Sequence, residues 1–405
     1  MNVSTKVKER RKANLGNLAV SLPTELLSDV FIRLVEGEIP STSIKTNHDA
    51  LISARRARFT LCGVCHIWRE TAISTKQIWT IIDFPHGVRT SFGRKRIESV
   101  SLLQDCLQRS DQMPLSLYLF GAAAKGKFSQ SMIEAVSNIV EPLISLCGHI
   151  QLDIDAIQVQ KLFRHPLQLP NLRSLVATVK QSPVTHLHTL DLTFASQLRH
   201  LAVFNSPSPT FLKLKLGVDL LLTRLTLQGT FYSSSIVTVL QNCPRLEYLL
   251  WQQLQADLPI SNLPPTVYMA SLHDITVSGS SPLSVLGHLD APQLARLQFV
   301  HPTSTIAMHN LGTYPLSNTS RFPMLQTLLL LGRTEVVHVD DEIIARFVEA
   351  HPHLETLCLH TQLTERMSQA IASIPALRNV KAIPPRPPPV PEFDDYITRW
   401  GRGEH

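Results

Sequence analysis

Apolar residues recur at helical spacing close to the start of the chain. They fall on one side of a helix and predict a single apolar stripe: Leu26, Leu27, Val30, Phe31 and Leu34. Ser21 or Thr24 can cap this helix by accepting backbone N–H bonds, and Pro23 is tolerated in a first turn. Glu25 suits the positive end of the helix dipole. The pattern therefore predicts a capped amphipathic helix.

A second helical stripe follows about thirty residues later. The residues that share its face are Leu61, Val64, Cys65, Trp68 and Ala72. The connection between the two stripes, Glu36–Arg58, is polar through Pro40–Ser43. We expect a loop insertion here, with residues 37–57 mobile, because no sustained apolar period appears before Leu51 and Ile52.

From residue 172 onward the chain repeats the pattern Leu-x-x-Leu-x-Leu. The first leucines of the units are Leu172, Leu187, Leu198, Leu222, Leu246, Leu272, Leu294, Leu325, Leu354 and Leu377. From Leu198 the successive intervals are 24, 24, 26, 22, 31, 29 and 23 residues, which is the period range of leucine-rich repeats. One unit cannot bury its own apolar face, whereas stacked units share a continuous core. Helical stripes between some units lie at Ile236–Leu240 and Ile343–Val348.

The repeats depart from a regular pattern in two ways. Their intervals vary, and the asparagine expected three residues after the last leucine is replaced by Ser206, Thr230 and Leu254. We therefore expect a fold of the α/β (α+β) class, in which an N-terminal helical unit precedes an irregular leucine-rich-repeat-like α/β solenoid.

Composition and periodicity divide the chain into five segments. The region before the repeats alternates a helix (97–107), a strand (115–119), a helix stopped by Gly148 and a strand (150–154). The predicted boundaries are 1–20, a disordered basic tail; 21–84, the helical unit with an inserted loop at about 36–58; 85–165, a helix/strand linker region; 166–383, the solenoid; and 384–405, a proline-rich tail. The polyproline run Pro384–Pro391 either ends the solenoid or binds an SH3- or WW-type groove.

Composition favours a globular, intracellular protein. The chain has 405 residues, of which 44% are hydrophobic and 17% charged, and its net charge is +6. The one basic cluster, Lys6–Lys12, is expected to be a solvated end, with a nuclear-import or nucleic-acid tail as the alternative. We find no apolar run of membrane-helix length, no signal peptide, and no disulfide framework among the six cysteines. We expect the cytoplasm and/or nucleus, with no membrane or nucleic-acid partner.

Residues 21–84 resemble the F-box, the short helical module of ubiquitin-ligase substrate receptors. The family pattern is Leu-Pro-x-Glu-Leu-Leu, then Ile/Val-Phe and Leu, then Val-Cys-x-x-Trp-Arg and a closing Trp. The residues that match it in order are Leu22, Pro23, Glu25, Leu26, Leu27, Val30, Phe31, Leu34, Val64, Cys65, Trp68, Arg69 and Trp79. The resemblance implies that these residues, apart from Arg69, bind a Skp-type adaptor. The long insertion is similar to that of F-box-like proteins of mushroom-forming fungi.

Motifs that carry chemistry give a weaker signal. Cys62-Gly63-Val64-Cys65-His66 fits the pattern of c-type haem attachment, but no export signal accompanies it and Cys65 already belongs to the F-box pattern. A zinc site would need a second Cys/His pair at ligand spacing. The glycine-rich phosphate loops and the G-x-S-x-G elbow are absent. We expect no cofactor, no metal and no catalytic set; an enzyme with a site assembled from scattered residues stays open.

Together the two resemblances imply the substrate receptor of a Skp–cullin–F-box ubiquitin ligase, non-catalytic itself. Its partners would be a Skp-type adaptor, cullin through that adaptor, and an unknown target protein. The rival is a non-catalytic leucine-rich scaffold that acts outside any ligase.

The strands of the repeats predict a lateral row of outward side chains. Because strand side chains alternate, the residue just before the second leucine of each unit should point outward. This row either binds the target protein or is simply solvated, and its members are His200, Arg224, Tyr248, Asp274 and Arg296.

Overall fold

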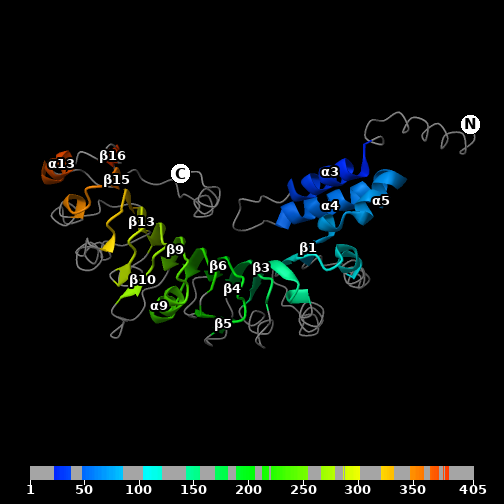
Figure 1. Ribbon diagram of the computed structural model, residues 1–405, viewed down its shortest axis with the longest axis horizontal. Coiled ribbons are helices and arrows are strands. Elements are labelled where there is room, and N and C mark those ends of the chain that lie inside the picture. Colours follow the sequence, from blue (N-terminus) through cyan, green and yellow to red (C-terminus); the bar gives the residue numbers. More distant parts are fainter. Residues whose placement is uncertain are drawn as a thin grey trace, which may run out of the picture. The chain divides into compact units, whose positions relative to one another are not determined.

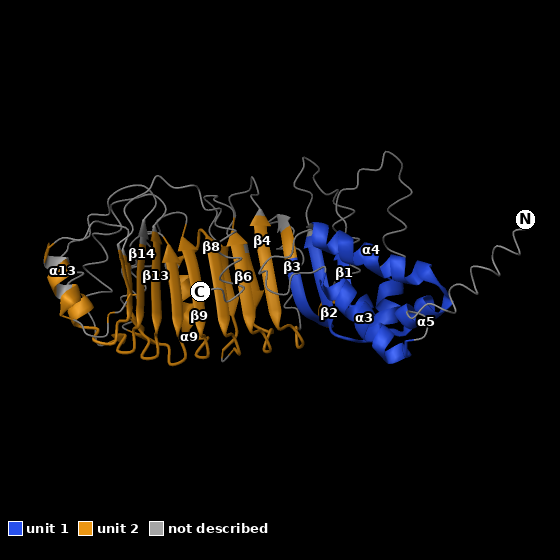
Figure 2. Cartoon of the chain, turned by 90° about the horizontal axis from the view of Figure 1, so that it is seen from above, with its two compact units in different colours: residues 1–126, 146–151, 392–405 blue, residues 127–145, 152–391 orange. Residues whose placement is uncertain are grey.

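The chain divides into two compact units (Figure 2). The first unit holds residues 1–126, 146–151 and 392–405, and the second holds residues 127–145 and 152–391. A computed structural model describes residues 22–37, 48–84, 104–120, 143–155, 169–180, 188–205, 212–218, 220–253, 266–278, 286, 288–301, 321–332, 347–359, 365–373, 377 and 379–382. The predicted tails, 1–20 and 384–405, lie outside these residues, as does the segment 38–47.

The first unit opens with helices (Figure 1). They are α3 (Thr24–Gly37), α4 (His48–Val64), α5 (His66–Ser74) and the 3₁₀ helix η1 (Lys76–Trp79). Strand β1 (Ile81–Phe84) follows and pairs in parallel with β2 (Leu115–Phe120). The backbone of β2 begins with a hydrogen bond of 3.0 Å from the Leu115 N–H to the Leu146 carbonyl. The helices therefore lead directly into a parallel sheet.

Large aromatic side chains lie in the core of this unit. Phe31 and Trp79 are fully buried, and the rings of Phe31 and Trp68 lie 5.1 Å apart in a tilted arrangement. The Trp79 indole N–H donates to the Ala72 carbonyl at 2.7 Å, which satisfies the polar group of a buried side chain. The buried members of the core are Leu27, Phe31, Val35, Leu51, Ala54, Leu61, Ala72, Ile78, Trp79, Ile81, Cys106 and Tyr118.

The predicted loop at 36–58 is too long. Helix α4 begins at His48, and Leu51 and Ala54 on it are fully buried. The sequence between Arg55 and Arg58 looks polar because it contains three arginines, but the Arg58 side chain is itself buried. Half of the expected insertion is thus a core helix.

The second unit is a solenoid of parallel strands (Figure 2). Its main sheet consists of parallel strands, and each of them pairs with the next strand named in the following sentence. The strands are β4 (Ser174–Lys180), β6 (His200–Asn205), β8 (Arg224–Gly229), β9 (Tyr248–Gln253), β11 (Asp274–Ser278), β13 (Arg296–His301), β14 (Thr327–Gly332), β15 (Thr356–Leu359) and β16 (Asn379–Ala382). The predicted mixed α/β solenoid is confirmed.

A tight turn precedes the strand in the repeats that start at Leu172, Leu198, Leu246, Leu272, Leu294, Leu325 and Leu354. The N–H of the first leucine bonds to the carbonyl three residues earlier, as from Leu246 to Cys243 at 3.1 Å and from Leu325 to Phe322 at 3.2 Å. That earlier residue is buried in every such turn of the described chain: Leu169, Ala195, Cys243, Met269, Ala291, Phe322 and His351. The repeat therefore has one more buried position than the leucine pattern indicates, apolar in all these turns except that of His351.

The unit predicted at Leu187 is not a repeat of the main sheet. Its strand, β5 (His188–Leu192), pairs instead with β7 (Leu212–Leu216) in a separate two-stranded sheet. Another small sheet joins β10 (Val267–Tyr268) to β12 (Leu289–Asp290). The predicted helix at 236–240 is confirmed as α9 (Ser233–Gln241), and a further helix, α13, spans Glu365–Ala372.

The region before the repeats matches its predicted strands but not one helix end. The strands predicted at 115–119 and 150–154 are β2 and β3 (Cys147–Asp155). Gly148 does not stop a helix, because it lies inside β3. None of the described helices is long and apolar enough to cross a membrane.

Candidate protein-docking site

Helix α3 has two apolar faces. Leu27, Phe31 and Val35 recur four residues apart and are buried. The second series starts just ahead of the helix and is exposed: Leu22 by 37%, Leu26 by 52%, Val30 by 49% and Leu34 by 47%. We call these four residues the α3 apolar face. The single stripe predicted from the sequence is therefore wrong, because the helix buries one apolar row and presents the other.

More apolar side chains are exposed on the neighbouring helices. Phe59 and Val64 on α4 are exposed by 44% and 51%, and Ile67 and Ile73 on α5 by 43% and 40%. Single exposed apolar residues are ordinary, whereas a contiguous group of them is typical of an interaction site. The first unit therefore carries more apolar surface than its own fold uses.

The structure separates the F-box-like residues into core and surface. Leu27, Phe31 and Trp79 belong to the core, and Cys65 and Trp68 are half-buried. Pro23 and Glu25 are exposed at the start of α3. Pro23 precedes the helix rather than lying in its first turn, and its carbonyl accepts the Leu27 N–H at 3.0 Å. The remaining pattern residues are exposed large apolar side chains, which a partner can reach together with Pro23 and Glu25: Leu22, Leu26, Val30, Leu34 and Val64.

Polar contacts join α5 to the two other helices, α3 and α4. The hydroxyl of Thr75, at the end of α5, lies 3.0 Å from the Ser28 hydroxyl on α3 and 2.7 Å from the Thr71 carbonyl. The Arg69 Nε donates to the Cys62 carbonyl at 2.9 Å, which satisfies one of the carbonyls at the end of α4. The matching arginine of the family pattern thus has a structural contact.

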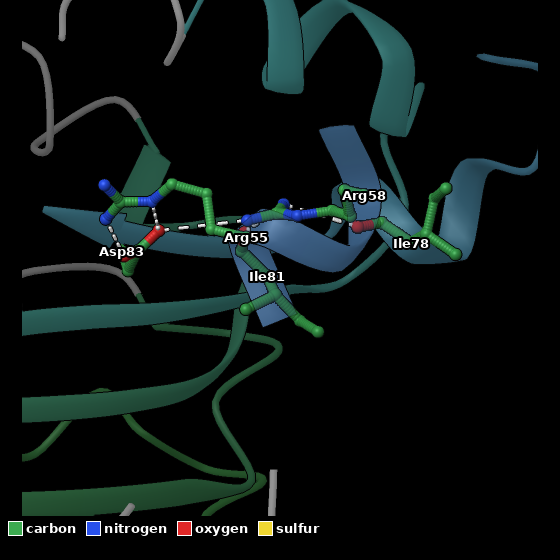
Figure 3. Close-up of polar contacts among 5 residues, drawn as sticks. All are labelled: Arg55, Arg58, Ile78, Ile81 and Asp83. Carbon is green, nitrogen blue, oxygen red and sulfur yellow. Dashed lines mark hydrogen bonds and ion pairs between the residues drawn. The ribbon is translucent and has the colours of Figure 1, made fainter. Parts of the chain in front are cut away.

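A buried ion-pair cluster fixes α4 to strand β1 (Figure 3). The Asp83 carboxylate accepts two hydrogen bonds from Arg55, one from Nε at 3.2 Å and one from Nη2. The Nη2 atom of Arg58 lies 3.8 Å from the same carboxylate. Arg58 also donates to the carbonyls of Ile81 at 2.8 Å and Ile78 at 3.3 Å. Burial lowers the pKa of both arginine guanidinium groups, and the Cys106 thiol beside them partly opposes this.

This cluster was missed in the sequence. Arg55 and Arg58 are three residues apart and face the same side of α4, but arginines on a helix usually face solvent. Only Asp83, in the otherwise apolar stretch Ile81–Phe84, hinted at a buried partner. The cluster joins helix α4 to strand β1 through residues that lie 28 positions apart, Arg55 and Asp83.

The row predicted on the strand face exists in the backbone. His200, Arg224 and Tyr248 are register partners on β6, β8 and β9, and Asp274 and Arg296 continue the row on β11 and β13. The side chains differ in access, however. His200 and Arg224 are exposed, Tyr248 and Arg296 are half-buried, and Asp274 is only 5% exposed. The accessible part of the row therefore lies at β6, β8 and β9.

The next row on the same face of the strands is closed. Ala202, Thr226, Leu250, Thr276 and Gln298 are register partners two residues further along, and each is at most 5% exposed. A partner can thus approach the strand face at its N-terminal edge, where the exposed His200 and Arg224 begin β6 and β8.

The cysteine motif forms no assembled site. Cys62 lies in α4, Cys65 stands between α4 and α5, and both thiols are free. Burial raises the pKa of the Cys62 thiol, against the charges of Arg109 and Arg69, so this thiol is a poor nucleophile. His66 is exposed and lies 3.6 Å from Glu70. Within the described residues no three His, Cys, Asp or Glu side chains gather as metal ligands.

No known protein-family model matches the chain, and no curated protein is significantly similar to it in sequence.

Proposed function

We propose that this chain is the substrate receptor of a Skp–cullin–F-box ubiquitin ligase. Its first unit would bind a Skp-type adaptor through the α3 apolar face, and its solenoid would hold the target protein. The chain itself performs no covalent step in this proposal. Its contribution is proximity, because tethering converts a bimolecular encounter with the ubiquitin-loaded enzyme into an intramolecular one.

One observation carries the proposal. Residues that match the F-box pattern in order include four large apolar side chains that α3 leaves exposed: Leu22, Leu26, Val30 and Leu34. Their neighbours Leu27 and Phe31 already fill the core, so the exposed row is not needed for folding. Keeping such a row in water is unfavourable by roughly 25 cal/mol per Å² of apolar surface. A partner helix or groove removes that penalty, which is a common mode of helix recognition.

The experiment measures capture of a Skp-type adaptor by the full chain. Leu26→Asp with Val30→Asp places two charges in the α3 apolar face without touching the core. We expect the adaptor Kd to rise roughly thirtyfold or more, the size of a lost binding hot spot. The matched control is Phe194→Asp with Val218→Asp, because these side chains are 48% and 76% exposed in the second unit.

Adaptor capture must survive in the control and disappear in the α3 variant. Circular dichroism of both variants checks that the helices remain folded. Equal capture by the wild type and a folded α3 variant would remove the adaptor assignment. The rival function, a scaffold outside any ligase, predicts that the adaptor binds but cullin does not join it.

A further inference from the structure

Basic side chains converge where β4, β6 and β8 begin. Arg173 directly precedes β4, Arg199 precedes β6, and His200 and Arg224 are the first residues of β6 and β8. Backbone bonds set them side by side. The N–H groups of Arg199 and His200 reach the Arg173 carbonyl at 2.8 and 3.0 Å, and the Arg224 N–H reaches the Arg199 carbonyl at 3.0 Å. We call these four residues the basic cluster.

The basic cluster is exposed, and its arginines form no ion pair within the described part of the solenoid. All four side chains are exposed, and no ion pair joins any of them to a carboxylate of the described chain. Elsewhere in the same unit an exposed basic residue does form an ion pair, since the Lys215 Nζ lies 2.8 Å from the Asp191 carboxylate. Unpaired arginines at adjacent strands thus distinguish this edge of the sheet.

One acid and one aromatic ring complete the surroundings. Although His200 is exposed as a residue, neighbouring atoms partly desolvate its imidazole ring. This desolvation, and then the charges of Arg224 and Arg199, lower the pKa of His200, while Glu247 opposes them. The positive charge of the basic cluster near neutral pH is therefore that of the three arginines. The Arg224 guanidinium lies 4.8 Å from the centre of the Tyr248 ring, which holds this side chain by a cation–π contact.

We propose that the basic cluster binds an acidic segment of the target protein. The inference rests on the proposed function and names the class of target that the solenoid would hold. Strands in a sheet lie about 4.8 Å apart, so the three arginines can engage successive acidic residues of one extended segment. Arginine pairs bidentately with carboxylate and with phosphate, and Tyr248 offers an apolar surface beside them. Glutamate, aspartate and phosphoserine share this chemistry.

The test measures fluorescence anisotropy of labelled peptides with the full chain. One peptide alternates glutamate with serine, a second replaces the glutamates by phosphoserine, and a third replaces them by lysine. Arg199→Gln with Arg224→Gln removes two charges from the basic cluster. We expect the acidic peptides to bind to the wild type. The Kd of these peptides should rise about tenfold or more in this variant, as for the loss of charge-assisted hydrogen bonds. High salt should also weaken the binding of the acidic peptides, because it screens exposed charges.

The control variant is Arg56→Gln with Lys213→Gln, which loses the same charge from exposed positions outside the basic cluster. It should bind the acidic peptides within about twofold of the wild type. Comparison of the two acidic peptides shows whether carboxylate suffices or phosphate is required; binding of either one supports the inference. Failure of both acidic peptides to bind, equal binding of the lysine peptide, or equal loss in both variants would overturn it.

Adaptor capture by the same protein preparations separates the two proposals. If the acidic peptides fail while the adaptor still binds, only the inference about the basic cluster is wrong. If the adaptor fails while the acidic peptides bind, the proposed function is wrong and the peptide site stands without it.

Discussion

At the scale of single residues, two buried amide side chains in the solenoid, Asn205 and Gln253, form hydrogen bonds with the backbone of a neighbouring turn. The Gln253 amide N–H₂ donates to the Phe231 carbonyl at 2.9 Å, and its oxygen accepts the N–H of Phe231 and of the Trp251 indole. Asn205 donates in the same way to the Thr230 carbonyl at 3.3 Å. These amides stand two residues after the last apolar residue of the repeat, one position earlier than the asparagine that we looked for.

Gly229 is required by the close approach of two turns. Its φ is 137°, in the region that side chains rarely adopt, and a Cβ there would lie 2.5 Å from the Asn205 Cβ. Glycine therefore occupies the position between the Asn205 and Gln253 amides, on the middle one of three adjacent strands.

His351 makes a pH-dependent contribution at this scale. It is 1% exposed, its Nδ1 lies 2.7 Å from the Phe347 carbonyl, and the two rings are 4.1 Å apart. Burial lowers the pKa of His351, and the bond to Phe347 partly opposes this. The unfolded chain therefore binds more protons than the folded one below about pH 6.5, and stability falls as the pH drops through that value.

Replacing His351 should remove part of this pH dependence. We expect His351→Leu to lower the unfolding free energy at neutral pH, because the hydrogen bond is lost, and to narrow the difference between neutral and mildly acidic pH. Urea unfolding followed at both pH values measures it. His353→Leu, at an exposed position in the same turn, is the control. The prediction would be contradicted if the unfolding free energy of His351→Leu differed between the two pH values by as much as that of the wild type.

At the scale of elements, α3 shows what a helical pattern can and cannot tell. Leu26 and Leu27 are neighbours, and so are Val30 and Phe31, so both rows continue at helical spacing. The pattern predicts the helix well, but it does not say which row packs inward. That choice depends on residues far along the chain, such as Trp79 and Tyr118, whose contacts follow from the tertiary fold.

The two rows of α3 should respond differently to truncation. Leu27→Ala should lower the unfolding free energy of the first unit by about 2–5 kcal/mol, because it leaves a cavity in a packed core. Leu26→Ala should change it by no more than about 0.5 kcal/mol, because that side chain is exposed. Thermal unfolding followed by circular dichroism compares them. A loss as large in Leu26→Ala as in Leu27→Ala would show that Leu26 packs within the fold.

Other elements show where sequence patterns mislead. The main strands were predicted because the leucine period persists over many units, each paired with its neighbours in register. The unit at Leu187 misled because its spacing imitates a repeat, although Leu172 and Leu198 are already 26 residues apart without it. The start of α4 was missed because Arg55 and Arg58 look solvated until Asp83 is known to lie against them.

At the scale of the whole molecule, we propose a different task for each of the two units. The first unit presents the α3 apolar face, and the second presents the basic cluster at the N-terminal edge of its sheet. The two surfaces differ in chemistry, so they suit two different partners: an apolar groove or helix for one, and an acidic segment for the other. A receptor in a ligase needs such a pair of independent surfaces.

The most direct measurement is affinity purification of the full chain from its native cells, with and without a proteasome inhibitor. We predict that a Skp-type adaptor and cullin co-purify with the wild-type chain, that both are lost in Leu26→Asp with Val30→Asp, and that captured target proteins accumulate when the proteasome is inhibited. Adaptor without cullin, or captured proteins whose amounts do not respond to the inhibitor, would contradict the ligase and leave a scaffold.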